Sequence, residues 1–361
     1  MRPESEEELA DAIRLATDPL EIRGGGTRTT GRQETNAAVL ETGGLRGIRL
    51  YEPGALTLVV AAGTPLAEVE AAVTAERQRL PFEPADWAGL TGAPGIGTIG
   101  GVVAANASGP RRVQAGACRD SLIGVRFVNG SGTVVKNGGR VMKNVTGYDL
   151  VKLMAGSWGT LGVLTEVAFK LLPAAQAQAT VVLPDLGAAE AVPALASALT
   201  SPYDVSGAGW LPGVGAMLRL EGLEGSVRHR SGALARRLAP FGAAEIVDGQ
   251  DQWRALAEVR PFHGKAGDVW RFNIRPSEAP RLVARLDAPV VLDWGGGLVW
   301  ALLPEGTDAR ALAGAIAGHA TRIRGAGAGA FPPEQSPIAA LTAGLRAQFD
   351  PRGILNPGRM G

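Results

Sequence analysis

The sequence predicts an α+β protein with two domains, and three observations lead to this class. At 361 residues the chain exceeds the usual size of one domain and can bury a sizeable core. In its first half, short strand-like runs alternate with helical runs, which describes a small α+β unit. In its second half, pairs of strand-like runs are separated by helical runs, which is typical of an antiparallel sheet with helices packed on one face.

The first half opens with a helix over 6–17, because apolar residues recur there at helical spacing and Pro19 ends it. A helix over 65–75 is also predicted, with Thr64 as its N-cap and Pro65 at its first helical position. Apolar runs between and around these helices predict short strands over 20–23, 38–42, 45–51 and 56–62.

A β-hairpin is predicted over 122–127 and 132–136, because Asn129-Gly130 between them is a strong turn dipeptide. Residues 143–150 then lead into a helix that ends near Gly156, and 163–172 alternates as a strand that Pro173 closes. The small residues 174–179 are typical of a linker. We therefore expect a first domain over 1–173 and a second over 174–361.

The second half repeats strands and helices in a different order. Helices are predicted over 186–199, 226–239 and 277–286, and strands over 179–183, 208–211, 216–220, 269–274, 290–293 and 297–303. The tail over 349–360 is too turn-rich for a helix, so it is either disordered or docked on another surface. Ile354 and Leu355 favour docking of the tail on the first domain.

Composition excludes several classes of protein. The 36 Lys and Arg residues against 35 Asp and Glu give a net charge of +1, which removes the global electrostatic argument for binding nucleic acid or an anionic membrane. Cys118 is the only cysteine, so the chain has no internal disulfide and no cysteine-ligated metal cluster, and a reducing cytoplasm fits best. The acidic N-terminus is no signal peptide, and the uncharged stretch 87–110 is too rich in glycine for a membrane helix.

A glycine-rich, uncharged stretch over 89–109 organises the chain. A backbone with so few side chains can press against a ligand, and it can hold an anion only through its N–H groups. Two further glycine clusters, over 23–27 and 156–162, have the same character. Turns between strands are the alternative reading of one cluster, but three clusters together favour a nucleotide-type cofactor.

Other motifs give weaker or negative signals. Gly95 to Gly100 matches the letters GxGxxG, but no acidic residue follows at the distance a dinucleotide-binding βαβ unit requires. The P-loop, HExxH and GxSxG motifs are absent, and the three histidines are far apart in sequence. Redox chemistry carried by a bound cofactor is the reading that remains.

The order of the motifs resembles one known family. RGGGT (23–27), GIGTIGGVVAANASG (95–109), a segment ending in GSWGTLGVLTEVAFKLLP (156–173) and DPRGILNPGRM (350–360) are similar to the FAD-binding half of the vanillyl-alcohol-oxidase/PCMH flavoprotein family. DWGG (293–296) and GHATR (318–322) extend the similarity to the FAD-binding subunits of bacterial glycolate oxidases. The resemblance covers nearly the whole chain. It implies a PCMH-type FAD-binding domain of two α+β subdomains, followed by an α+β cap domain with an antiparallel sheet.

The resemblance also implies which residues bind FAD. The first loop and the second loop would surround the pyrophosphate and the ribityl or flavin ring, a third segment would meet the adenine side, and the tail would return toward the flavin. Residues 22–33 contain no histidine, so the flavin is expected to be non-covalent. The implied cofactor-binding residues are Arg23, Gly24, Gly25, Gly26, Thr27, Gly95, Thr98, Gly100, Gly101, Ala104, Asn106, Gly109, Gly162, Val163 and Asn356.

The implied activity is the oxidation of glycolate, a small 2-hydroxy acid, to glyoxylate by one subunit of a complex. A larger flavoprotein subunit and an iron–sulfur subunit are the implied partners, in the cytoplasm or at the inner face of the cell membrane through the complex. Two alternatives stay open: a self-sufficient FAD-dependent D-2-hydroxy acid dehydrogenase, and a non-catalytic subunit for assembly or electron relay.

Catalytic residues are less evident than the FAD loops. Relatives that act alone carry a metal-binding HxGDGN-type motif, and the nearest string here, His263 to Asp268, lacks its second histidine and its asparagine, so no metal site is expected. His319 and Arg322 are the candidate pair for acid–base catalysis and carboxylate binding; the alternative for His319 is a contact with the backbone at a helix end. Arg111 and Arg112 either clamp a phosphate or form a solvated pair.

Overall fold

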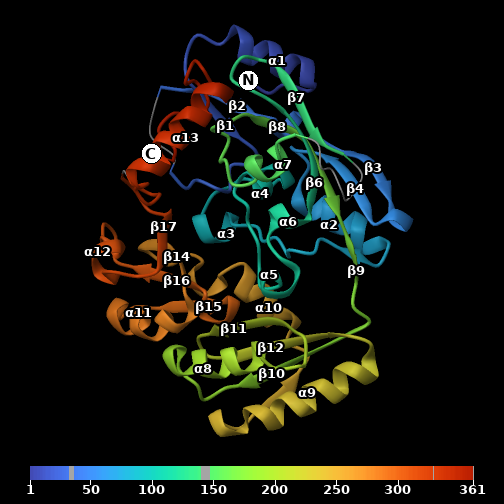
Figure 1. Ribbon diagram of the computed structural model, residues 1–361, viewed down its shortest axis with the longest axis vertical. Helices are drawn as coiled ribbons and strands as arrows, with labels where there is room; N and C mark the ends of the chain where they lie inside the picture. Colours follow the sequence, from blue (N-terminus) through green and yellow to red (C-terminus); the bar gives the residue numbers. More distant parts are fainter. Residues whose placement is uncertain (32–35, 140–146, 328, 361) are drawn as a thin grey trace. The chain divides into compact units, whose positions relative to one another are not determined.

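The computed structural model describes residues 1–31, 36–139, 147–327 and 329–360. These residues form two compact units that are discontinuous in sequence (Figure 1). Unit 1 consists of Met1–Ser108, Gly116–Ala174 and Pro333–Gly361, and unit 2 consists of Gly109–Ala115 and Ala175–Pro332. This division differs from the expected domains 1–173 and 174–361 in two segments, because 109–115 belongs to unit 2 and 333–361 to unit 1.

Unit 1 contains a five-stranded antiparallel sheet of order β3-β4-β8-β6-β7, and two short strand pairs. The sheet strands are β3 (Ile48–Glu52), β4 (Thr57–Ala61), β6 (Leu122–Val128), β7 (Val134–Gly138) and β8 (Val163–Lys170). The pairs are parallel β1 (Leu20–Arg23) with β2 (Ala38–Glu41) and antiparallel β5 (Gln78–Arg79) with β9 (Leu172–Pro173). The helices are α1 (Glu6–Leu15), α2 (Leu66–Ala75), α3 (Ala88–Thr91), α4 (Ile99–Ala104), α6 (Cys118–Ser121), α7 (Leu150–Met154) and α13 (Ser336–Phe349).

Helix α1 forms for reasons visible in its sequence. The Ser5 side chain accepts a hydrogen bond from the Glu8 amide at 3.1 Å, and three glutamates in the first turn favour the positive end of the helix dipole. Leu9 and Ile13 are fully buried in a cluster that also includes Leu20 of β1. The helix thereby anchors the strand that leads into the first glycine loop.

The C-terminal tail docks on β1. The amide of Leu20 donates to the carbonyl of Ile354 at 2.7 Å, and the amide of Asn356 donates back to the carbonyl of Leu20 at 2.9 Å. Ile354 and Leu355 are buried in the same cluster as α1. Arg352 reinforces the contact by donating to the carbonyls of Ala16 at 3.0 Å and Gly130 at 2.8 Å. Docking, rather than disorder, is therefore the state of the tail.

Unit 2 is built on an eight-stranded antiparallel sheet of order β13-β10-β12-β11-β15-β16-β14-β17. Its strands are β10 (Ala177–Leu183), β11 (Val205–Leu211), β12 (Gly215–Gly222), β13 (Glu245–Val247), β14 (Asp268–Ile274), β15 (Val290–Asp293), β16 (Leu298–Leu303) and β17 (Gly318–Arg324). Its helices are α5 (Arg112–Ala115), α8 (Ala188–Leu199), α9 (Glu224–Leu238), α10 (Gln250–Ala257), α11 (Ala279–Leu286) and α12 (Ala309–Ala313). Two apolar clusters lie between this sheet and its helices.

The α+β class and the antiparallel second sheet are confirmed, and several local predictions are corrected. Helix α2 begins at Leu66 and Thr64 does not cap it, because its hydroxyl instead donates to the Ala61 carbonyl at 2.7 Å and accepts from the Gly47 amide at 2.9 Å. Half of the expected linker 174–179 belongs to strand β10. Residues 143–146 of the expected lead-in to α7 lie outside the described residues.

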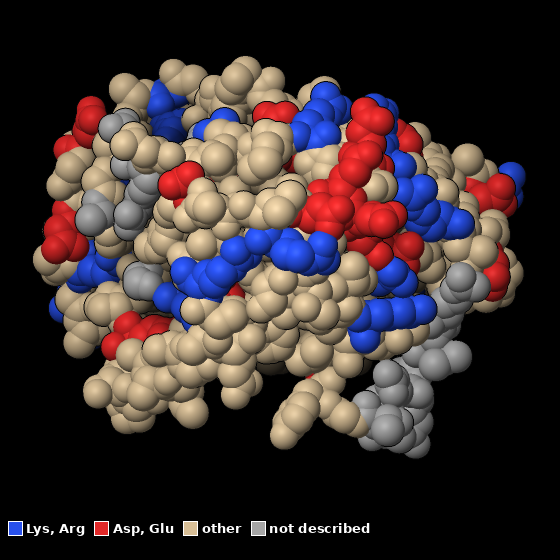
Figure 2. Space-filling view, turned by 90° about the horizontal axis from the view of Figure 1, so that it is seen from above, with Lys and Arg blue, Asp and Glu red and all other residues tan. Residues whose placement is uncertain are grey.

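Charged side chains of both signs lie beside one another on the face seen in Figure 2. Ion pairs within unit 1 include Arg46 with Glu68 at 2.6 Å and Arg126 with Glu6. Over the described residues, no helix is both long and apolar enough to cross a membrane. No group of three or more potential metal-binding His, Cys, Asp or Glu side chains occurs within the same residues.

Candidate functional site

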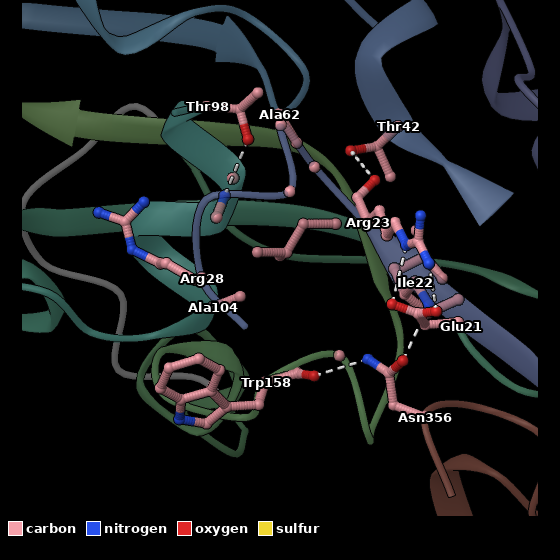
Figure 3. A pocket seen from close by; sticks show the side chains of 18 of the residues that line it. Glu21, Ile22, Arg23, Arg28, Thr42, Ala62, Thr98, Ala104, Trp158 and Asn356 are labelled. Carbon is pink, nitrogen blue, oxygen red and sulfur yellow. Dashed lines mark hydrogen bonds and ion pairs between the residues drawn. The ribbon is translucent and has the colours of Figure 1, made fainter. Parts of the chain in front are cut away.

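A pocket in unit 1 brings the three glycine clusters and the tail together (Figure 3). Most of the expected cofactor-binding residues line it, and Gly95, Asn106 and Gly109 are not among its lining residues. The lining is Glu21, Ile22, Arg23, Gly24, Gly25, Gly26, Thr27, Arg28, Thr29, Thr42, Ala62, Thr98, Gly100, Gly101, Ala104, Ser157, Trp158, Gly159, Gly162, Val163, Leu164, Asn356 and Arg359. Segments more than 300 residues apart in sequence therefore share one wall, as between Ile22 and Asn356, which are 334 residues apart.

The first loop supplies hydrogen-bond donors. The amides of residues 24–27 donate to no other residue in the described part of the chain. Gly26 has a φ of 75°, which turns the backbone as only glycine does readily. Gly24, Gly25 and Gly26 are half-buried in the pocket lining, and amides without an acceptor in the chain can donate to an anionic or carbonyl ligand.

Gly95 packs against the backbone of this loop. A Cβ atom on Gly95 would lie 1.6 Å from the carbonyl oxygen of Gly25, and one on Gly25 would lie 1.4 Å from the carbonyl oxygen of Ile96. The two loops thus pack backbone against backbone, with no room for any side chain between them. Gly95 shapes the pocket although it does not line it.

The second loop differs from expectation in its chemistry. The amides of Ile99, Gly100 and Gly101 are already used: they donate to the Thr64 carbonyl at 3.0 Å, to the Ala62 carbonyl at 2.8 Å and to the Thr98 hydroxyl at 3.2 Å. Thr98 is thereby the N-cap of α4 (Figure 3). Amides from several loops were expected to bind the cofactor together. The amides of this loop are in use, and it contributes small side chains to the pocket lining instead.

Asn356 joins the tail to both other parts of the pocket wall. Its Oδ1 accepts from the Ile22 amide at 2.8 Å, and its Nδ2 donates to the Trp158 carbonyl at 2.8 Å (Figure 3). Both polar atoms of this buried side chain are therefore occupied. Asn356 positions β1 and the third loop around the pocket, and Gly162 and Val163 continue that loop along the lining.

The charges around the pocket are distributed unequally. Arg23 donates to both carboxylate oxygens of Glu21, at 2.8 and 2.6 Å, and this pairing raises the pKa of Arg23. Arg23 is thus neutralised within the chain. Arg28, which the sequence analysis missed, has no such carboxylate in hydrogen-bond contact among the described residues.

Arg28 is the buried cation of the pocket. It donates to the Ala85 carbonyl at 2.7 Å, and its guanidinium lies 4.9 Å from the ring centre of Trp87. Burial lowers the pKa of Arg28 to about 10, so it is still charged at neutral pH. Its Nε is buried without a hydrogen-bond partner. The position of Arg28 directly after RGGGT was the signal in the sequence, but its burial depends on Trp87.

The expected catalytic pair is not a pair in the structure. His319 and Arg322 both lie on β17, and they are three residues apart, so their side chains lie on opposite faces of the sheet. Arg322 lies 5.8 Å from the ring centre of Trp270 and donates to the Gly327 carbonyl. The alternative that placed His319 at a helix end is wrong, because the residue belongs to a strand.

His319 has a different polar neighbour. The Nδ2 atom of Asn273 donates to its Nε2 at 3.0 Å, because an amide nitrogen can only donate. Partial desolvation, followed by the charge of Arg271, lowers the pKa of His319 below its usual value. The imidazole is therefore neutral at neutral pH, with its proton on Nδ1.

Arg111 and Arg112 belong to unit 2 and are not among the residues that line the pocket. Arg111 donates to both carboxylate oxygens of Glu221, at 2.9 and 2.6 Å, and Arg112 lies 4.5 Å from the ring centre of Trp294. Arg111, being paired with Glu221 and largely buried, is neither a phosphate clamp nor a solvated side chain. The Gly109 carbonyl accepts from Nε1 of the same Trp294 at 3.0 Å.

The fold and the pocket define a flavoprotein with an FAD-binding domain, and comparison with known proteins agrees: residues 1–138 match the family model described as an FAD binding domain. The glycolate oxidase subunit GlcE of Escherichia coli is 37% identical over 98% of this chain and 95% of its own length. The chain therefore belongs to the family of glycolate oxidase subunit GlcE.

More distant relatives share parts of the chain or the fold alone. The glycolate oxidase subunit GlcD of Bacillus subtilis is 36% identical over 30% of this chain and 25% of its own length. A solved structure of alkyldihydroxyacetonephosphate synthase superposes with a TM-score of 0.72 at 16% identity, covering 99% of this chain and 75% of that one. This chain therefore shares its fold with alkyldihydroxyacetonephosphate synthase.

The residues of the pocket fit FAD. Four unused amides and a buried arginine can face a diphosphate, while the small residues of the second loop leave room for flat rings. The one pocket-lining carboxylate, that of Glu21, is already paired with Arg23. Nothing in this wall opposes a dianionic dinucleotide.

Proposed function

We propose that this chain is the FAD-binding subunit of a glycolate oxidase, which converts glycolate to glyoxylate. The observation that carries the proposal is the similarity to glycolate oxidase subunit GlcE over 98% of the chain, together with a pocket suited to FAD in the matching domain. Both the fold and the site are thereby accounted for by one function.

FAD, when bound, accepts the hydride that leaves the α-carbon of the substrate. The residues of this chain bind and orient it. The amides of residues 24–27 and the guanidinium of Arg28 hold the diphosphate, and Asn356 fixes the surrounding loops. No histidine lies in the described part of residues 22–33, so the proposed binding is non-covalent.

The proposed partners are a larger flavoprotein subunit and an iron–sulfur subunit that takes up the electrons. Similarity to GlcD, a second kind of glycolate oxidase subunit, supports a complex assembled from related flavoproteins. The chain's single cysteine supports a separate protein as the carrier of any iron–sulfur cluster. We place the complex in the cytoplasm or at the inner face of the cell membrane.

Anaerobic mixing with glycolate tests the proposal. The isolated chain, loaded with FAD, and the complex with its two partners are each followed at the flavin absorbance band. The proposal predicts that both take up FAD and that glycolate bleaches the flavin of the complex. Bleaching of the isolated chain would favour the self-sufficient dehydrogenase. A complex that turns over glycolate equally well after FAD is removed from this subunit alone would contradict a role for its pocket.

A further inference from the structure

One face of the eight-stranded sheet in unit 2 carries a polar group of side chains that the FAD pocket does not explain. Strands β16, β14 and β17 are neighbours in the sheet (Figure 1). In their register Arg271 pairs with Trp300 on one side and Thr321 on the other, and Asn273 pairs with His319. Arg271, Asn273, His319 and Trp300 therefore share a face. The opposite face is apolar and holds Trp270, Phe272 and Ala320 in the core.

Arg271 is the exceptional member of this group. Its Nε is buried without a hydrogen-bond partner, and it makes no ion pair or hydrogen bond with any described residue. Its only contacts of note within those residues are with two indoles: the guanidinium lies 5.3 Å from the ring centre of Trp294 and 5.7 Å from that of Trp300. Burial lowers its pKa to about 10, so it remains a cation at neutral pH.

Two other half-buried arginines of unit 2 are satisfied by the chain itself. Arg111 is paired with Glu221, and Arg324 donates to the carbonyls of Phe262, Gly267 and Lys265 at 3.2, 3.2 and 2.6 Å. A guanidinium whose Nε is buried without such a partner is costly in a folded protein unless a ligand supplies the missing acceptor. Arg271 thus indicates a bound anion.

The surroundings reinforce a positive potential at this point. Arg112 lies 4.5 Å from the ring centre of the same Trp294, and after burial its charge is the next cause that lowers the pKa of Arg271. Asp293 is the carboxylate that opposes this effect, and its Oδ1 is occupied by the Trp294 amide at 2.7 Å. The like charge of Arg112 disfavours the cationic form of Arg271, and an anion bound to Arg271 would offset that effect.

The neighbouring polar pair suggests what the anion carries. Asn273 and His319 lie one pair along the ladder from Arg271, so Arg271 and His319 are diagonal neighbours about 7 Å apart in such a register. At this separation the charge of Arg271 contributes, after burial, to the lowered pKa of His319. A cationic fork beside neutral donors and acceptors matches a carboxylate with a hydroxyl group on the adjacent carbon.

We propose that Arg271 binds the carboxylate of a small 2-hydroxy acid on this face, with the substrate hydroxyl directed to the Asn273–His319 pair. The indoles of Trp294 and Trp300 lie beside the guanidinium and limit the ligand to a small anion. This site needs no metal ion, and it replaces Arg322 by Arg271 as the carboxylate-binding residue. The choice of a 2-hydroxy acid rests on the proposed function, whereas the anion site rests on the geometry of unit 2.

The test measures ligand binding by calorimetry on the full chain and the glycolate KM of the complex. The variants are Arg271→Gln, which removes the charge, Arg271→Lys, which keeps it but loses the fork, and the control Arg322→Lys on the opposite face. We expect Arg271→Gln to weaken glycolate binding and raise KM about tenfold or more, Arg271→Lys to lie between, and Arg322→Lys to match the wild type. FAD content, which reports on unit 1, and circular dichroism verify that each variant is folded.

Ligand analogues test the same site without any substitution. The wild-type chain should bind glycolate and D-lactate but not the uncharged amide glycolamide, and inorganic phosphate should compete weakly. Equal binding of glycolamide, equal or tighter binding of phosphate, or an unchanged glycolate KM in Arg271→Gln would overturn the assignment. If Arg271→Gln abolishes glycolate binding while the wild-type complex fails to oxidise glycolate, the site stands and the proposed function fails. If the complex oxidises glycolate normally with Arg271→Gln, the proposed function stands and the assignment of Arg271 fails.

Discussion

Replacement of Asn356 is expected to destabilise unit 1 through two separable effects, the loss of side-chain hydrogen bonds and backbone strain. Asn356→Gly removes the hydrogen bonds to Ile22 and Trp158, each 2.8 Å long. At about 0.5–1.5 kcal/mol each, the two bonds predict a loss of about 1–3 kcal/mol in the free energy of unfolding of unit 1. Glycine accepts the φ of 45° at this position without strain.

Asn356→Ala loses the same bonds and adds backbone strain. Since alanine disfavours a φ of 45°, it should cost about 1–2 kcal/mol more than glycine. Asn356→Asp keeps the acceptor for the Ile22 amide but sets a carboxylate oxygen against the Trp158 carbonyl, so it should be less stable than wild type. Each variant is unfolded in urea, with release of FAD as the probe of unit 1. If glycine and alanine both leave the midpoint unchanged, the side chain of Asn356 does not hold the tail and the argument is refuted.

Three further predictions follow from other contacts. Gly25→Ala should lose FAD on gel filtration because its Cβ would lie 1.4 Å from the Ile96 carbonyl oxygen, whereas Gly54→Ala, with open space around it, should retain FAD; equal retention would contradict the backbone packing of the two loops. Arg352→Ala should lower the free energy of unfolding by about 1 kcal/mol and speed proteolysis of the tail, because its carbonyl contacts are lost; an unchanged cleavage rate would argue against tail docking. The pKa of His319 in the folded chain is lowered from 6.5, so the unfolded chain binds a proton at this imidazole at a higher pH than the folded chain does. The free energy of unfolding of the wild type should therefore fall, relative to that of His319→Gln, as the pH falls through 6.5. Parallel curves of stability against pH for the two proteins would refute the lowered pKa.

Local sequence patterns were sufficient to predict those elements whose structure depends on residues close in the sequence. Strand β1 begins and ends at the residues predicted from its apolar run, Leu20 to Arg23. The hairpin forms at Asn129, whose Oδ1 accepts from the amides of Ser131 and Thr133 at 3.0 and 2.9 Å. The glycine clusters also predicted a shared pocket, because a backbone without side chains has few other uses at such density.

Distant contacts decided what the sequence did not reveal. Arg28 is buried because its guanidinium packs on Trp87 and donates to the Ala85 carbonyl, which is 57 residues away in the sequence. His319 and Arg322 could be assigned to opposite faces only after 318–324 was known to be a strand. Arg271 Nε lacks a hydrogen-bond partner among the described residues because of its surroundings in space, and the sequence around Arg271 does not carry that information.

Helix α13 was also missed. Its apolar residues Ile338, Leu341 and Leu345 recur at helical spacing, but they are exposed, so no burial in a core accompanies the pattern. Pro337 also marks its first turn, where a missing N–H costs nothing. The apolar spacing and the helix start were therefore both readable in the sequence.

The position of Asn356 after unit 2 in the chain has a consequence for biosynthesis. A ribosome makes strand β1 and the glycine loops first, and it makes the residues that pair with Leu20 only after all of unit 2. Since domains generally fold as they emerge, a nascent chain can complete unit 2 while the cofactor cradle still lacks one wall. Flavin capture should therefore be a post-translational event, and chains stalled before residue 350 should emerge colourless even with unit 2 fully folded.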